Sequence, residues 1–238
     1  MEKKKSPALT PRLQKLADWV EPGAKVADIG TDHGYLPVWL LTTGRIASAI
    51  GSDLRAGPLE NARKTAVRYA VSEKISLRLG NGLNGILPSE ADTLVIAGMG
   101  GENIAAILSE APWARQCTLL LQPMSRAEVL REFLENHGYA IAREALVEDR
   151  GTLYPVMLVR AGSMTLTTAQ RYGGARLLHD PLENRYLIEE IVRLQSAIAG
   201  VCHSSSKADI EKADALREIS YALMTLREEW RNANSQAN

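Results

Sequence analysis

The stretch "DIGTDHGYLP" at residues 28–37 decides the fold of this chain. It follows the short apolar run KVA and precedes the apolar run VWLL, an order that predicts a strand, a glycine-bearing turn and a helix start. Such a turn is typical of a nucleotide-binding loop in an α/β domain. A dinucleotide loop requires G-x-G-x-x-G, but from Gly30 this chain reads G-T-D-H-G-Y, with Asp32 at the second glycine position and Tyr35 at the third.

The carboxylate of Asp32 discriminates between classes of cofactor. Beside a pyrophosphate it would be repelled by roughly a few kcal/mol at an effective dielectric near ~20. S-adenosylmethionine carries no phosphate, and its sulfonium and ammonium groups are cationic, so we expect this cofactor and not a nicotinamide or flavin dinucleotide. We expect no metal at Asp32-His33, because adjacent residues rarely ligate one ion together and the other histidines do not cluster in the sequence.

Apolar runs of strand length alternate with helical patterns after an N-terminal helix at 10–20, whose start is marked by Thr10-Pro11. We expect strands at 25–29, 46–52, 75–79, 93–97, 118–122, 139–147 and 152–160, and helices at 34–43, 57–71, 102–110 and 126–136. The last two strands are separated only by EDRG, which predicts an antiparallel hairpin. Parallel strands that end in an antiparallel pair are the pattern of an α/β, class I (Rossmann-like) methyltransferase sheet.

Two amphipathic helices are expected after Gly162. Their apolar positions recur at spacings of three and four: Leu187, Ile191, Leu194, Ile198 and Val201, then Leu216, Ile219, Leu223, Leu226 and Trp230. The segment GVCHSSS at 200–206 separates them and offers serines as helix caps. We expect an antiparallel helical hairpin with coiled-coil-like packing, which divides the chain into a methyltransferase domain at 1–162 and a hairpin domain at 163–238.

Polar residues and glycines stand where the early strands are expected to end, and ligands of open α/β sheets bind at that edge. The second strand ends in Asp53, a carboxylate suited to the two hydroxyls of a ribose, although a helix N-cap is the alternative role. The fourth is followed by AGMGG at 97–101. Many methyltransferases of exocyclic adenine amines carry N-P-P-Y/W there, so this sequence disfavours that chemistry and leaves a glycine-lined opening for a base.

The charge of the chain is balanced, with 28 basic and 28 acidic residues. A basic excess falls within residues 1–80, which hold 13 Lys/Arg and 8 Asp/Glu, and centres on Arg55, Arg63, Lys64, Arg68, Lys74 and Arg78. It is either a solvated helix face or a phosphate-contacting patch. No run approaches the length of a membrane span, no signal-peptide pattern follows the first lysines, and the two cysteines have no close partner, so we expect a cytoplasmic protein.

The motifs DIGTDHGYLP, NGL, IAGMGG and LQP occur in this order and are followed by the expected hairpin. In this combination the chain resembles the bacterial tRNA (adenine-22-N1)-methyltransferase family over nearly its whole length. The resemblance implies a class I methyltransferase domain joined to a coiled-coil-like C-terminal domain. It further implies S-adenosylmethionine as cofactor and methylation of ring nitrogen 1 of adenine 22, in the D-arm region of tRNA.

Carried over position by position, the resemblance implies roles for individual residues. Cofactor contacts fall on Asp28, Gly30, His33, Asp53, Asn81, Gly82 and Leu83, with backbone contacts at Ala97 and Gly98. Asp32 and Tyr35 fall beside the transferred methyl group and the incoming base, as the catalytic residues. Asn81 departs from the GDGL pattern of the family, but an asparagine still hydrogen-bonds an adenine amino group.

The tRNA contacts implied are the basic residues around Arg55, Arg63, Lys64 and Arg68, together with the C-terminal hairpin. Two other functions remain open from the sequence. One is a methyltransferase that acts on another RNA or on a small molecule. The other is a non-enzymatic module whose sheet binds S-adenosylmethionine weakly and whose hairpin serves association. We expect a monomer, and the sequence leaves a dimer open.

Overall fold

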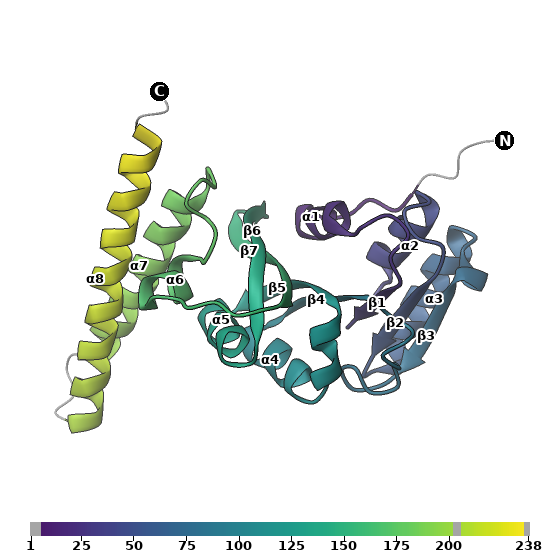
Figure 1. Ribbon diagram of the computed structural model, residues 1–238, viewed down its shortest axis with the longest axis horizontal. Helices are drawn as coiled ribbons and strands as arrows, with labels where there is room; N and C mark the ends of the chain where they lie inside the picture. The colour runs from purple at the N-terminus through teal and green to yellow at the C-terminus, as the bar shows by residue number, and fades with distance from the viewer. Residues whose placement is uncertain (1–5, 202–205, 236–238) are drawn as a thin grey trace.

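A seven-stranded sheet forms the centre of the molecule, in the order β3-β2-β1-β4-β5-β7-β6 (Figure 1). The computed structural model describes residues 6–201 and 206–235. The strands are β1 (Val26–Ile29), β2 (Ala49–Asp53), β3 (Ile75–Leu79), β4 (Thr93–Gly100), β5 (Thr118–Ser125), β6 (Tyr139–Asp149) and β7 (Thr152–Ala161). The first five are parallel, and β7 pairs antiparallel with both β5 and β6. The predicted methyltransferase sheet is therefore confirmed.

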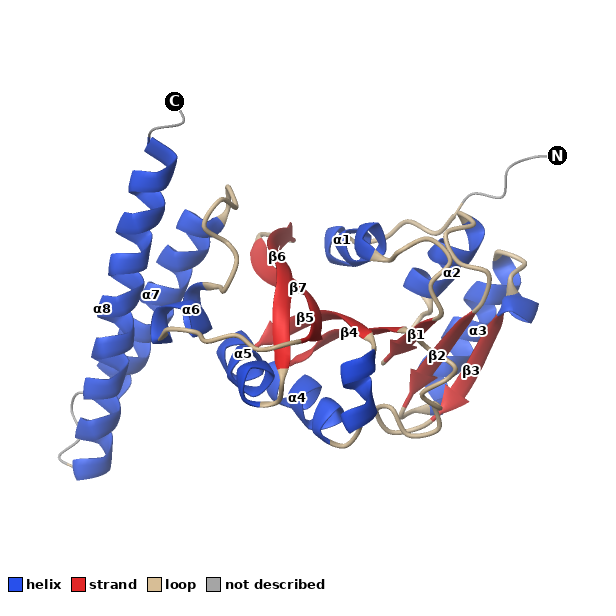
Figure 2. Cartoon of the chain, in the orientation of Figure 1, coloured by secondary structure: helices blue, strands red, loops and turns tan. Residues whose placement is uncertain are grey.

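Helices cover both faces of this sheet (Figure 2). Those on the sheet are α1 (Pro11–Trp19), α2 (Tyr35–Thr42), α3 (Ala56–Arg68), α4 (Gly101–Ser109) and α5 (Ala127–Asn136), with short 3₁₀ turns at Ser72–Lys74 and Pro112–Gln116. To one side of the sheet lie α6 (Thr168–Gly173), α7 (Glu183–Val201) and α8 (Lys207–Ser235). Leu94 and Ile96 pack with α4 and α5, whereas Val95 packs with α1, α2 and α3. All three β4 side chains are fully buried, which explains why the parallel strands are continuous apolar runs and do not alternate.

The predicted boundaries differ from the structure at several ends. The second strand begins at Ala49 rather than at residue 46, and β4 and β5 continue to Gly100 and Ser125. Helix α3 ends at Arg68 rather than at 71, because Ala70 turns into the left-handed region with φ 55°. Thr10 caps α1 as predicted, accepting a hydrogen bond from the Leu13 amide.

The C-terminal helices form the predicted antiparallel hairpin. Leu223 of α8 packs with Leu187 near the start of α7, and Arg227 donates a 2.8 Å hydrogen bond to Asn184. The late part of α8 therefore lies beside the early part of α7. The predicted breaker at 200–206 falls largely outside the described residues. Helix α6 was not predicted; a capping box formed by Thr167 and Gln170 starts it.

A buried ion pair joins the sheet to the segment that leads into the hairpin. Arg131 of α5 lies 2.8 Å from Glu144 of β6, and neither side chain is exposed to solvent. Glu144 also accepts hydrogen bonds from the amides of Ala175 and Arg176, and Arg131 donates one to the Arg171 carbonyl. These contacts satisfy charges that would otherwise be costly to bury, and they fix the α6–α7 connection against the sheet.

Candidate active site

A cavity of about 420 Å³ opens at the carboxyl ends of β1 to β4. Four of the predicted cofactor residues line it: Gly30, Asp53, Asn81 and Gly82. The lining residues that were not predicted include Leu54, Met99, Asn103 and Ile107. Two sequence signals could have identified some of them: Met99 stands within the AGMGG segment, and Leu54 is an apolar residue directly after the acid that ends β2. The volume is that of a site for a small ligand, and its walls mix apolar side chains with a few polar groups, as such sites do.

The first turn brings backbone close to this cavity. Gly30 has φ +73°, a conformation that glycine adopts readily, and its amide donates to the Ser52 carbonyl at 2.7 Å. The amide of Thr31 donates to the same carbonyl, which ties β1 to β2 at this edge. A side chain at position 30 would collide with the methyl group of Met99. The left-handed backbone conformation therefore favours glycine, whereas the Met99 methyl group ends a flexible side chain that can move aside.

Asp28 lies behind the wall of the cavity and does not line it. Its side chain is buried, and the Thr31 hydroxyl donates a 2.7 Å hydrogen bond to it. Burial raises the pKa of Asp28 to about 6; the Thr31 hydrogen bond opposes this rise, and the nearby charge of Asp53 adds to it. A cation bound in the turn would favour the charged form of this group.

Asp53 is not the N-cap of helix α3, because Arg55 occupies that position. Its carboxylate lines the cavity although the residue is only 8% exposed. One oxygen accepts a 2.9 Å hydrogen bond from the Arg55 amide, just before helix α3. The backbone thus fixes the orientation of the carboxylate, and its position on the cavity wall suits the vicinal hydroxyls of a ribose.

The remaining predicted cofactor residues are placed differently. Leu83 is buried in the core, so only its backbone could contact a ligand. Ala97 is half-buried and Gly98 is exposed, and neither lines the cavity. His33 also lies outside the cavity lining, in the turn that precedes α2.

Asp32, His33 and Tyr35 form an exposed group at the start of α2. Asp32 has φ 44°, which is uncommon for a residue other than glycine, and its side chain is 63% exposed. A His33 ring nitrogen lies 3.7 Å from the Asp32 carboxylate, and the His33 ring stacks on Tyr35 with centroids 5.3 Å apart. Two stacked rings beside an exposed carboxylate are suited to receive a planar base with polar edges.

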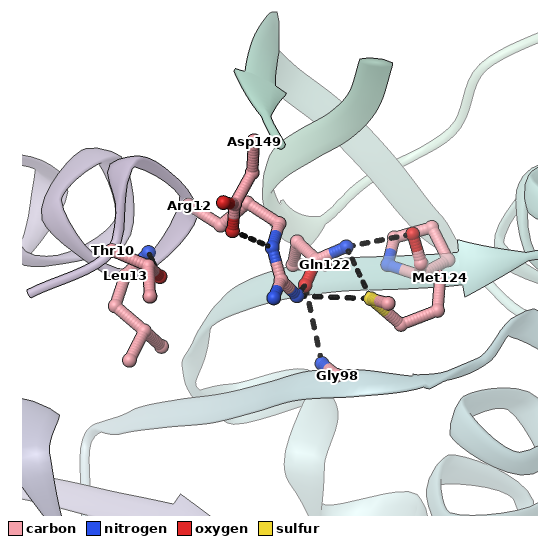
Figure 3. A network of polar contacts seen from close by, with 8 residues as sticks. Thr10, Arg12, Leu13, Gly98, Gln122, Met124 and Asp149 are labelled. Atoms are coloured by element: carbon pink, nitrogen blue, oxygen red, sulfur yellow. Dashed lines mark hydrogen bonds and ion pairs between the residues drawn. The ribbon is translucent and has the colours of Figure 1, made fainter. Parts of the chain in front are cut away.

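At the end of β4, the AGMGG segment is held by side chains from distant parts of the chain (Figure 3). The pairing of β4 with β5 is irregular between Ala97 and Met99, so Gly98 forms a bulge. Its amide donates to the fully buried Gln122 at 3.2 Å, and Arg12 of α1 donates to the same oxygen at 2.9 Å. The sequence motif LQP contained Gln122, but nothing in the sequence pointed to Arg12.

The predicted basic patch is exposed on α3 and at its start. The Arg55 side chain is 77% exposed and that of Arg63 is 63% exposed, and Lys64 and Arg68 also face solvent. Arg63 pairs with Glu60 at 3.3 Å, and Arg55 lies 3.9 Å from Asp53. Arg55 also lines the cavity, so the patch begins at the rim of the site.

The side chains and helices of the described ranges bear on metal binding and on membrane insertion. No group of three or more His, Cys, Asp or Glu side chains there is placed to hold a metal ion. No helix among those residues is both long enough and apolar enough to cross a membrane.

Comparisons with known proteins agree on one family. Residues 9–157 match the family model described as a methyltransferase domain. The tRNA (adenine(22)-N(1))-methyltransferase of Bacillus subtilis (strain 168) is 35% identical over 184 residues, which span 76% of each chain.

Solved structures extend the likeness to almost the whole chain. The crystal structure of the B. subtilis m1A22 tRNA methyltransferase TrmK superposes with a TM-score of 0.85 at 29% identity, over 92% of this chain and 99% of that one. Streptococcus pneumoniae Sp1610, crystallised in complex with S-adenosyl-L-methionine, superposes with a TM-score of 0.82 at 32% identity, over 92% and 100%. Sequence, fold and the strand-end site together show that the chain belongs to the tRNA (adenine(22)-N(1))-methyltransferase family.

Proposed function

We propose that this protein transfers a methyl group from S-adenosylmethionine to ring nitrogen 1 of adenine 22 in tRNA. The observation that carries the proposal is the cavity at the carboxyl ends of β1 to β4, with an oriented Asp53 and a glycine turn on its wall, in a chain of this family. The relatives support the two ligands: one is named for adenine 22 of tRNA, and another binds S-adenosyl-L-methionine.

The cavity residues fit this cofactor by charge and by shape. Asp53 would accept hydrogen bonds from the ribose hydroxyls, and Asn81 would contact the adenine amino group. Leu54 and Ile107 offer apolar surface to the adenine ring. Gly30 admits the cofactor close to the backbone of the first turn, and the negative charge of Asp28 behind that turn favours a cationic methionine end.

Asp32 and Tyr35 are proposed to act on the incoming base. S-adenosylmethionine supplies the methyl group as an electrophile on a sulfonium. The lone pair of adenine N1 would form the new bond to the methyl carbon as the sulfur–methyl bond breaks, and S-adenosylhomocysteine would leave as a neutral thioether. No proton leaves that nitrogen, so the protein needs no general base for attack. Asp32 would accept a hydrogen bond from the exocyclic amino group and stabilise the positive charge that develops on the purine. Tyr35, stacked on His33, would hold the ring plane.

The target adenine must leave its stack to reach this group, at a cost of roughly a few kcal/mol. We propose that contacts to the tRNA backbone offset this cost. They would come from the basic patch of Arg55, Arg63, Lys64 and Arg68 and from the hairpin domain at 163–238, with the sheet domain at 1–162 carrying the chemistry. We expect a monomer to bind one tRNA in the cytoplasm.

One set of experiments separates this function from its rivals. Calorimetry with S-adenosylmethionine measures cofactor binding, and transfer of labelled methyl groups to tRNA, ribosomal RNA and a small-molecule extract measures the substrate class. We expect binding together with transfer to tRNA alone. Transfer to another class would identify a methyltransferase with another substrate, and binding without any transfer would identify a non-enzymatic module.

A further inference from the structure

Four residues from separate parts of the chain form a continuous polar chain at the carboxyl edge of the sheet (Figure 3). Asp149, at the end of β6, accepts a 2.7 Å hydrogen bond from Nε of Arg12. Arg12 Nη1 donates to Gln122 Oε1 at 2.9 Å, and Gln122 Oε1 also accepts from the Gly98 amide at 3.2 Å. We name this set of Asp149, Arg12, Gln122 and Gly98 the Arg12 relay.

The relay fixes which way round the Gln122 amide lies. Its oxygen receives two donors, from Arg12 and Gly98, while its nitrogen donates to the Pro123 carbonyl at 2.8 Å. A flipped amide would face both donors with its own NH₂ group, so the flipped state is strongly disfavoured. Gln122 is fully buried, which makes each of these hydrogen bonds expensive to lose.

Gly98 is the point at which the relay reaches the site. It is the bulge residue of β4, with φ +77°, and a side-chain atom built there would meet nothing within 4 Å. Its amide is engaged by Gln122, and the next residue, Met99, lies on the wall of the cofactor cavity. The path of the backbone at Gly98 therefore sets both that wall and the open surface above it.

The guanidinium of Arg12 is already paired with groups of the protein. Its side chain is only 21% exposed, its Nε is paired with Asp149, and its guanidinium lies 4.9 Å from the centroid of the Tyr154 ring. A planar fork that donates in two directions at once is a property of arginine that lysine lacks. These contacts favour a role in holding other groups over a direct contact with a phosphate.

We propose that Arg12 is a positioning residue for methyl transfer: by orienting Gln122, it holds the Gly98 bulge and so aligns the cofactor with the incoming base. This inference rests on the proposed function, and nothing in the sequence pointed to it. Arg12 touches neither the cofactor cavity nor the Asp32 group, so it acts through Gln122. Misplacement of reacting groups by about 1 Å costs on the order of 100-fold in rate, so loss of the relay should appear in kcat.

The test compares Arg12→Ala and Arg12→Lys with Lys15→Ala, which removes a positive charge from the same helix outside the relay. Lys15 contacts the Trp19 ring, 5.5 Å from its centroid, and takes no part in the Gln122 contacts. Methyl transfer is measured at saturating tRNA and saturating S-adenosylmethionine, and cofactor affinity is measured by calorimetry. We expect Arg12→Ala to lower kcat by about 10- to 100-fold while the cofactor Kd changes less than about twofold.

We expect Arg12→Lys to lower kcat too, by a smaller factor, because one ammonium cannot reproduce the fork, and Lys15→Ala to leave kcat unchanged. A raised KM for tRNA with unchanged kcat would overturn the proposal and make Arg12 a tRNA contact. Unchanged kcat and KM would overturn it as well.

Asp149→Asn provides a second test of the proposal if Arg12→Ala does not fold. It removes the charge that holds Nε but retains an acceptor of the same shape, and we expect it to lower kcat with little change in melting temperature. Equal kcat in wild type and Asp149→Asn, together with equal kcat in Arg12→Lys, would contradict the relay. If the wild type itself fails to methylate tRNA, the proposed function has failed, and that result is distinct from any result on the variants.

Discussion

The hydroxyl of Thr31 donates a 2.7 Å hydrogen bond to the carboxylate of Asp28, directly behind the wall of the cofactor cavity. Asp28 is buried, and burial raises its pKa from the ordinary 3.8 to about 6, against the opposing effect of Thr31. The charged carboxylate of Asp28 therefore lowers the stability of the cofactor-free protein. Such a cost is expected where a buried charge serves a ligand.

Asp28→Asn is therefore expected to stabilise the cofactor-free protein in a pH-dependent way. Because the folded-state pKa is raised, charging Asp28 costs stability: the cost is absent below about pH 4 and complete above about pH 6. Above pH 6 the melting temperature of Asp28→Asn should exceed that of the wild type, by about 2–4 °C for each kcal/mol gained in the free energy of unfolding. The difference should vanish toward pH 4. Cofactor affinity, measured by calorimetry at pH 7.5, should fall. A difference in melting temperature that is constant from pH 4 to 8 would contradict this account of Asp28.

Gly30→Ala is expected to weaken both the fold and cofactor binding. The chain offers a matched control in Gly44, which has φ +72°, close to the +73° of Gly30, but open space around it. Gly44→Ala should cost only the left-handed backbone conformation, about 1–2 kcal/mol by chemical denaturation. Gly30→Ala should cost about the same in stability, because the flexible Met99 side chain can move away from the new methyl group. Met99 lines the cavity, however, so its displacement should lower cofactor affinity by about tenfold or more, whereas Gly44→Ala should leave that affinity unchanged. Unchanged affinity in Gly30→Ala would show that the close approach at Gly30 has no functional role.

Glu183→Gln is expected to stabilise the protein at neutral and alkaline pH. Glu183, at the start of α7, is 1% exposed, and its Oε2 finds no hydrogen-bond partner within the part of the chain that the structure describes. Burial raises the pKa of Glu183 to about 8, and the charges of Asp180 and Glu144 add to this. The cost of deprotonation is thus absent below about pH 4.5 and grows until about pH 8.

The gain in melting temperature from Glu183→Gln should therefore increase between pH 5 and pH 8. Glu218 lies exposed on α8, so Glu218→Gln provides the control and should shift the melting temperature little at any pH. A gain from Glu183→Gln that is the same at pH 5 and pH 8 would mean that the buried carboxylate is not the cause.

Asp32→Asn is expected to retain cofactor affinity and to lose most transfer to tRNA. Asp32 lies outside the cofactor cavity, and its carboxylate is largely exposed at the start of α2, where the base would arrive. Loss of one preorganised group that stabilises developing charge typically costs about 100-fold or more in kcat. Single-turnover methyl transfer measures this loss, with Asp18→Asn on exposed α1 surface as the control. Wild-type activity in Asp32→Asn would remove Asp32 from the mechanism.

The sheet and much of the cofactor cavity could be predicted from the sequence because they depend on local order. A strand, a glycine turn and a helix start follow one another at Gly30, and Asp53 stands at the end of the next strand. Parallel strands place their carboxyl ends at one edge, so these residues meet without any knowledge of side-chain packing. Asn81 and Gly82, which follow the third strand, could be predicted to lie at the cavity for the same reason.

The rest depends on contacts between residues far apart in the sequence. Arg12 and Gln122 are 110 positions apart, and Arg12 and Asp149 are 137 apart, so no local pattern joins them. Met99 lines the cavity next to the bulge of β4, and a bulge has no spacing that a sequence reveals. The burial of Leu83 also depends on packing against distant residues. Its place after a glycine therefore could not show that its side chain turns into the core.

The most direct test of the central claim is to map the methylated nucleotide. Purified enzyme and S-adenosylmethionine are incubated with an unmodified tRNA transcript that carries adenine 22, and with the same transcript carrying guanine 22. Reverse transcription then locates a methyl group on the base-pairing edge, and mass spectrometry identifies the modified base. We expect 1-methyladenosine at position 22 of the first transcript and no methylation of the second. Methylation at any other position, or equal methylation of both transcripts, would contradict it.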